Sequence, residues 1–196
     1  PYLLPKIVPV LKENYPELSL YLHEAQTQQL VRQLEDGKLD CLVLASVEET
    51  SLFKEIELYQ EPLSIAVPCV HEWAGLEQVV MLDLNGKTVL ALGDGHCLRD
   101  QALGCCFAAG AKDDERFKAN SLETLRNMVA AGAGMTLLPE LSVPSERKKD
   151  GVCYLKAVNP EPSRSLVLVY RPGSPLRARF EQLAAAIKEN LTNNRG

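Results

Sequence analysis

The chain has 196 residues, 46% of them hydrophobic and 24% charged, with a net charge of −5. This composition is typical of a globular α/β protein of one large domain or two small lobes, and it disfavours direct DNA contact because no dense basic run occurs. No segment approaches the about 20 apolar residues of a membrane span, and no secretory signal is visible, so we expect a cytoplasmic protein without a membrane partner.

The first half of the chain alternates helical and strand-like patterns. Apolar residues at helical spacing predict a helix over residues 2–14, followed by a strand over 18–22. A second helix is expected over 27–35, ending before Gly37, and the apolar run 41–45 predicts a buried strand. Strands over 53–59 and 63–67 are expected on either side of Glu61 and Pro62.

The second half continues the alternation. A strand over 87–92 leads into a helix that begins at Asp94 or Gly95, and another helix over 121–131 is capped by Asn120 or Ser121. Strands over 135–138, 154–158 and 166–170 precede a last helix from about 175 to 191. This order predicts a mainly parallel sheet with crossovers.

Proline-marked turns at Pro62 and over 160–162 are candidate crossing points between two lobes. We expect lobe I to contain residues 1–61 and 166–196 and lobe II to contain residues 62–165. Because no strand precedes the first helix, we also expect that an N-terminal strand, and the domain before it, are missing from this chain.

Two of the six cysteines, Cys97 and Cys106, lie nine residues apart in the helix expected after residue 94. Nine helical residues rise about 13.5 Å, whereas a disulfide requires Cα atoms within about 7 Å, so the helix and the bond exclude each other. The pair is either two unrelated thiols or a switch whose oxidation unfolds the segment. No C-x-x-C spacing predicts a metal site. Cys41 and Cys153 lie in apolar strands and are expected to be small core residues, and Cys69 has no neighbour that indicates chemistry.

Several motifs resemble the effector-binding domain of LysR-type transcriptional regulators. They are LEDGKLD at 34–40 before an apolar strand, LETLRNMVAAG at 122–132, and GMTLLP at 134–139. Within that family, GDGHCLRDQA at 93–102 resembles the redox segment of the peroxide-sensing members, and YRPGSPLR at 170–177 supports the same assignment.

The resemblance implies an α/β fold of two Rossmann-like lobes, similar to the periplasmic binding proteins, in a cytoplasmic homotetrameric regulator. By position, Cys97 is the peroxide-reactive thiol, Cys106 is its disulfide partner, His96 and Arg99 flank the reactive thiol, and Thr27 lines the peroxide pocket. The implied partners are hydrogen peroxide, DNA through the missing N-terminal domain, RNA polymerase, and a thiol reductant such as glutaredoxin. No cofactor or metal is expected.

The reactive thiol must ionise, and the N-terminus of a helix, Arg99 and His96 would each favour the anion. Simpler interpretations remain open: His96 is a loop residue, Arg99 pairs with Asp100 or Glu123, and Thr27 caps a helix. The family more often has an aromatic residue before the resolving cysteine. This chain has Cys105 there, a second thiol able to compete with Cys106.

Oxidation is expected to unfold residues from about 96 to 107. Closing a loop of about ten residues stabilises the cross-linked form by roughly 2–3 kcal/mol, against the lost helix and its core contacts through Leu98, Ala102, Leu103 and Phe107. Two other functions stay open: a domain of the same family that binds a small organic anion, and a thiol peroxidase, although the chain lacks the peroxiredoxin Pro-x-x-x-Thr-x-x-Cys motif. We expect no enzymatic turnover.

Overall fold

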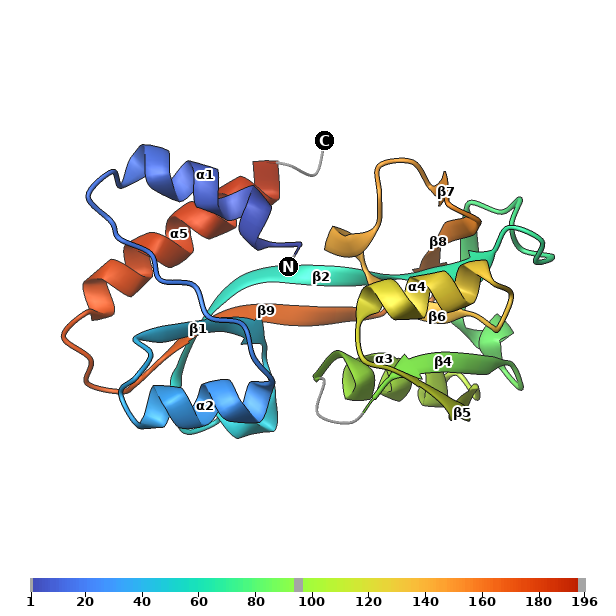
Figure 1. Ribbon diagram of the computed structural model, residues 1–196, viewed down its shortest axis with the longest axis horizontal. Coiled ribbons are helices and arrows are strands. Elements are labelled where there is room, and N and C mark those ends of the chain that lie inside the picture. The colour runs from blue at the N-terminus through green and yellow to red at the C-terminus, as the bar shows by residue number, and fades with distance from the viewer. Residues whose placement is uncertain (1, 94–96, 194–196) are drawn as a thin grey trace. The chain divides into compact units, whose positions relative to one another are not determined.

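The computed structural model describes residues 2–93 and 97–193. Contacts within the chain divide it into two compact units, which are Pro1–Gln60 together with Ser165–Gly196, and Glu61–Arg164. Each unit combines helices with strands (Figure 1). The units are described in turn as the first unit and the second unit.

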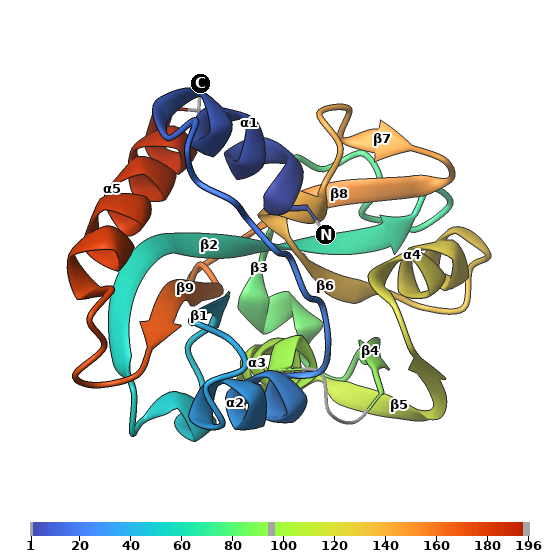
Figure 2. The same ribbon diagram turned by 60° about the vertical axis from the view of Figure 1, so that its left-hand side comes forward.

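The first unit places helices on a short antiparallel strand pair. Strand β1 pairs with β9, from Cys41 opposite Tyr170 to Ala45 opposite Leu166. Helix α1 lies along α5 in both views (Figures 1 and 2). The elements of this unit are α1 (Leu4–Asn14), α2 (Thr27–Glu35), β1 (Cys41–Ala45), η1 (Glu48–Thr50), the start of β2 (Lys54–Pro68), most of β9 (Ser163–Tyr170) and α5 (Arg177–Asn193).

Helix α2 is fixed to the first unit by apolar packing and by one arginine. Val31 and Leu34 of α2 are buried in a cluster with Leu42 of β1 and with residues of β9. The guanidinium of Arg171 donates hydrogen bonds to the carbonyl oxygens of Leu34 and Leu39. These carbonyls lie at and just beyond the C-terminal end of α2, where backbone acceptors have no partner within the helix. The positive charge also complements the negative end of the helix dipole.

The second unit contains two groups of strands. Strand β2 pairs antiparallel with β6 and β8, β3 pairs parallel with β8, and β4 pairs parallel with β5. Its elements are the end of β2, β3 (Gln78–Val80), η2 (Met81–Leu84), β4 (Thr88–Leu92), α3 (Cys97–Ala108), β5 (Lys112–Ala119), α4 (Leu122–Ala130), β6 (Thr136–Pro139), η3 (Glu140–Ser142), β7 (Lys148–Lys149) and β8 (Val152–Val158).

The strands differ from the sequence-based prediction in several respects. The mainly parallel sheet is wrong, because the strands that carry the chain between the units, β2 and β9, pair antiparallel with β1, β6 and β8 in the described pairings. The strand over 18–22 is wrong, since this segment is extended without a strand partner and Tyr21 and Leu22 are exposed. Strand β2 runs without a break through Glu61 and Pro62, and strand β5 was not predicted at all.

Helix α3 ends in a glycine motif that accounts for its C-terminal boundary. The N–H groups of Gly110 and Ala111 donate to the carbonyls of Phe107 and Cys106, which is the Schellman pattern. Gly110 has φ +83°, and a Cβ atom there would lie 2.4 Å from Oδ1 of Asn85. Both facts favour glycine, because other residues are strained at this backbone angle and an added Cβ atom would displace the side chain of Asn85.

We therefore expect Gly110→Ala to lower the free energy of unfolding by about 1–2 kcal/mol, as incompatible glycine substitutions do. Urea denaturation followed by circular dichroism measures the change. Gly37→Ala is a matched control for the backbone term alone, since Gly37 has φ +73° but nothing within 4 Å of its Cβ position. Equal losses of unfolding free energy in the two variants would show that the contact with Asn85 does not add to the destabilisation.

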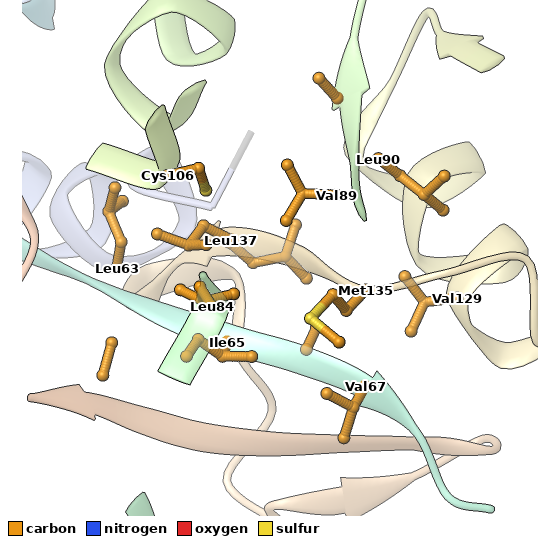
Figure 3. Packing of buried hydrophobic residues seen from close by; sticks show 14 of the residues in the cluster. Leu63, Ile65, Val67, Leu84, Val89, Leu90, Cys106, Val129, Met135 and Leu137 are labelled. Carbon is orange, nitrogen blue, oxygen red and sulfur yellow. The ribbon is translucent and has the colours of Figure 1, made fainter. Parts of the chain in front are cut away.

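One continuous apolar cluster forms the core of the second unit (Figure 3). Residues of β2, β4 and β6 meet there with the inward faces of α3 and α4. Cys106 projects from α3 into this cluster on the side of Val89 and Leu137 (Figure 3). The fold therefore places the second predicted redox residue inside the core rather than at the surface.

Candidate redox site

Cys97 and Cys106 lie on the same helix. Helix α3 runs without interruption from Cys97 to Ala108 and so includes both residues, as the sequence predicts. Both cysteines are free thiols. A regular helix separates their Cα atoms by about 13.5 Å, so no disulfide joins them while α3 is intact. Cys97 is the first helical residue and is half-buried, whereas Cys106 is only 1% exposed.

The surroundings of Cys106 keep its thiol protonated. Burial raises the pKa of Cys106 to about 12, and the nearby Cys105 thiol and Asp113 carboxylate add to this effect. The residue also borders a cavity of about 10 Å³ between α3, β4, α4 and β6. That volume holds about one water molecule, so the core under this part of α3 is not completely filled.

The raised pKa of Cys106 predicts a stability loss in alkali. Below about pH 8.5 the thiol is protonated in both states, but between about pH 8.5 and the folded pKa of about 12 only the unfolded thiol ionises. The unfolded state then binds fewer protons, so stability falls as pH rises. We expect the free energy of unfolding of Cys106→Ala to fall by about 1–2 kcal/mol less than that of the parent between pH 8.5 and 10.5.

Urea titrations of both proteins at the two pH values measure this difference. Ser51→Ala is a control that leaves all ionisable groups in place and should keep the parent slope. Identical pH slopes for the parent and Cys106→Ala would mean that the Cys106 thiol ionises as easily in the folded state as in the unfolded one.

Arg99 pairs with two acidic side chains. Its Nη1 lies 3.2 Å from Oδ1 of Asp100, and its Nη2 lies 3.5 Å from Oδ2 of Asp113 on β5. The expected pairing with Asp100 is confirmed, whereas Glu123 pairs with Arg126 instead. The carboxylates of these two aspartates therefore partly neutralise the positive charge of Arg99. The Asp113 contact ties α3 to β5.

The other predicted site residues are distributed along the chain. His96 lies outside the described residues, as do the predicted helix starts at Asp94 and Gly95. Thr27 is half-buried at the first position of α2 in the first unit, and Gln26 rather than Thr27 occupies the N-cap. Cys97 and Cys106 belong to the second unit, so the grouping of Thr27 with them stays a prediction. Burial raises the pKa of the half-buried Cys105 thiol.

The sequence of this chain matches a known domain family over nearly its whole length. The model of the LysR substrate binding domain matches residues 1–192 of the chain. This chain belongs to the LysR substrate-binding-domain family. The fold class expected for a LysR domain, α/β with two lobes, is confirmed by this match and by the solved structures below.

The LysR domain is similar to proteins named for their response to peroxide. It is 60% identical over 191 residues to the "Hydrogen peroxide-inducible genes activator" of Pectobacterium carotovorum subsp. carotovorum. It is also 60% identical over 191 residues to the "DNA-binding transcriptional dual regulator OxyR" of Escherichia coli (strain K12). Each alignment covers 97% of this chain but 63% of the relative, so the chain spans less than two thirds of their length.

Solved structures of OxyR in two redox states share the fold of this LysR domain. The oxidised form matches with a TM-score of 0.92 at 58% identity, and the reduced form with 0.93 at 56% identity. Both matches cover 100% of this chain and 92% of the solved chain. The two scores differ too little for the overall fold to indicate a redox state.

Besides Cys97 and Cys106, the LysR domain contains a pair of thiols that lie next to each other and that the sequence did not predict. Sγ of Cys69 lies 2.9 Å from Sγ of Cys153, although 84 residues separate them in the chain. Only the pairing of β2 with β8 brings them together, so no spacing motif could have indicated it. Cys153 is 2% exposed, as expected of a core residue.

Within residues 2–93 and 97–193 of the LysR domain, no group of three or more histidine, cysteine, aspartate or glutamate side chains is placed to hold a metal ion. In the same ranges, no helix is both long and apolar enough to cross a membrane.

Proposed function

We propose that this LysR domain is the regulatory domain of a peroxide-responsive transcription regulator, in which Cys97 is oxidised and Cys106 is its disulfide partner. The observation that carries the proposal is the placement of both thiols on one regular helix that their bond would have to unwind. The similarity to activators named as hydrogen peroxide-inducible supports the choice of oxidant.

The two cysteines differ in the way that a reactive and a resolving thiol must differ. Cys97 is half-buried in the first turn of α3 and is the more accessible of the two thiols, whereas Cys106 is 1% exposed. The Cys97 thiolate attacks one peroxide oxygen, the O–O bond breaks, and the products are a sulfenic acid and water after protonation. The sulfur of Cys106 then displaces a second water and forms the disulfide.

Cys106 reaches Cys97 only after α3 has unwound. The free-energy cost of unwinding α3 is moderate, because only Leu98, Leu103 and Cys106 of this short helix are buried. A small cavity also lies beside these three residues. Phe107 is 51% exposed, so the expected core contact of this residue is wrong. It lies about 100° around the helix from Cys106, on the solvent side. The reduced and oxidised forms are therefore close in free energy, as a reversible switch requires.

The remaining parts of the proposal concern the whole regulator. We place Thr27, His96 and Arg99 around the peroxide and the sulfur of Cys97, and we place the DNA contact of the regulator in a separate DNA-binding domain. The regulator is a cytoplasmic homotetramer that engages RNA polymerase. A thiol reductant such as glutaredoxin restores the dithiol by exchange. The domain consumes peroxide once per reduction cycle and is not an enzyme.

Stoichiometric peroxide, followed by alkylation and mass spectrometry of the unreduced digest, tests this function. We expect a peptide linking Cys97 to Cys106, lost in Cys97→Ser and retained in Cys41→Ser. A bond between Cys97 and Cys105 would transfer the resolving role to Cys105. Repeated peroxide consumption with a thiol reductant would indicate a peroxidase, and an unmodified Cys97 would overturn the proposal.

A further inference from the structure

The second thiol pair lies where strands β2 and β8 end their ladder. Val67 is opposite Cys153 in the antiparallel register, and the N–H of Cys69 donates to the carbonyl oxygen of Gly151 at 2.9 Å. Cys69 is thus opposite Gly151, and Cys153 lies two residues further along β8. Residues two apart on a strand share one face, so the two thiols project to the same side of the ladder.

Joining these thiols requires little movement. The sulfur atoms are 2.9 Å apart, and a disulfide bond is about 2.03–2.05 Å long, so they must approach by less than about 1 Å. The backbone on both sides is already fixed by five residue pairs, from Ser64 opposite Lys156 to Pro68 opposite Val152. This is the reverse of Cys97 and Cys106, whose bond requires the loss of a helix.

The two thiols of this pair have distinct environments. Cys153 is 2% exposed, and burial raises the pKa of its thiol to about 11, with the adjacent Cys69 thiol adding to the shift. Cys69 is half-buried and is followed by Val70, which is 92% exposed. A reagent in solution therefore meets Cys69 first, and Cys153 is placed to resolve the product.

We propose that Cys69 and Cys153 are a second redox couple of this domain, oxidised to a disulfide by low-molecular-weight disulfides. The Cys69 thiolate attacks one sulfur of the small disulfide, whose S–S bond breaks and releases one thiol. Cys153, losing its proton, then attacks the mixed disulfide at the Cys69 sulfur and releases the second thiol. Two protein thiols are oxidised and one small disulfide is reduced to two thiols.

This couple goes beyond the peroxide switch and is independent of it. Its bond links β2 to β8 across an 84-residue separation and leaves the described strands in place. In the chain-entropy model, closing a loop of this length strongly lowers the conformational entropy of the unfolded state. The oxidised couple therefore stabilises the second unit without changing its secondary structure, whereas oxidation at α3 changes that structure.

The test uses oxidised and reduced glutathione as the redox buffer and the chain carrying Cys97→Ser, Cys105→Ser and Cys106→Ser. We expect a peptide linking Cys69 to Cys153, an unchanged circular dichroism spectrum, and a rise in Tm on the order of 5–10 °C. Adding Cys41→Ser to this background should not change the result. With Cys153→Ser, the reaction should stop at a glutathione adduct on Cys69.

The same digest of the unsubstituted chain keeps the test valid if the triple variant does not fold, because the two possible bonds give peptides of different mass. A persistent glutathione adduct on Cys69 while Cys153 is present would overturn the proposal, since it would show that Cys153 does not resolve it. Two unmodified thiols at the most oxidising ratio would overturn it as well. Neither result tests the proposed Cys97–Cys106 switch, because the peroxide experiment detects a different disulfide.

Discussion

Replacing Cys106 with serine is expected to separate oxidation from refolding. In Cys106→Ser, peroxide should still oxidise Cys97, but the loss of helical signal from the 12-residue α3 should disappear, because no bond forces the helix to unwind. The oxidised parent should lose most of that helix, since its linked Cα atoms must come within about 7 Å. Circular dichroism of both proteins before and after stoichiometric peroxide measures the effect.

The control for this experiment is Cys41→Ser, which removes a thiol from β1 in the first unit and should respond as the parent does. Burial and the nearby Asp40 raise the pKa of the Cys41 thiol to about 11, so it is a poor nucleophile at neutral pH. Equal losses of helical signal in the parent and in Cys106→Ser would show that disulfide formation at Cys106 does not drive the refolding.

Glu61→Ala is expected to cost about 3–5 kcal/mol in free energy of unfolding, because it leaves a positive charge without its buried partner. Glu61 is 0% exposed, and its Oε2 lies 2.7 Å from Nη2 of Arg164. Its Oε1 accepts a hydrogen bond from the N–H of Leu141 at 2.9 Å. Glu61 and Arg164 are the first and last residues of the second unit, so the ion pair joins the two points where the chain enters and leaves it.

Urea denaturation measures the loss, and Glu181→Ala provides the matched control. Glu181 pairs with Arg177 one turn away on α5, and half or more of each side chain is exposed, so this change should cost at most about 0.5 kcal/mol. Arg164→Ala should resemble Glu61→Ala, since it leaves the carboxylate unpaired. Similar small losses in all three variants would mean that the buried ion pair does not hold the two chain crossings together.

Local sequence signals predicted the helices well. Helix α2 and strand β1 have the predicted bounds, and of the two predicted caps Ser121 is the one whose side chain accepts a hydrogen bond from the N–H of Thr124. These features depend on neighbours within a few residues, which the chain itself supplies. The helical segment between Cys97 and Cys106 likewise depends on residues close in the chain.

Strand predictions failed where strand formation depends on a partner strand rather than on the local sequence pattern. Strand β5 consists largely of charged residues, yet it forms because β4 offers a parallel edge. Residues 18–22 are apolar enough for a strand but meet no partner in the described chain. The prolyl residue at 62 does not interrupt β2, and the next residue, Leu63, donates its N–H to the carbonyl oxygen of Pro162.

The sequence by itself determined that Cys97 and Cys106 share a helix, because helix formation depends on residues close in the chain. It also carried the family motifs, which the match over residues 1–192 confirms. Only the tertiary structure decided which thiols are buried and which meet. The burial that raises the pKa of Cys106 and the ladder that brings Cys69 to Cys153 both arise from residues distant in the chain, and folding alone brings those residues together.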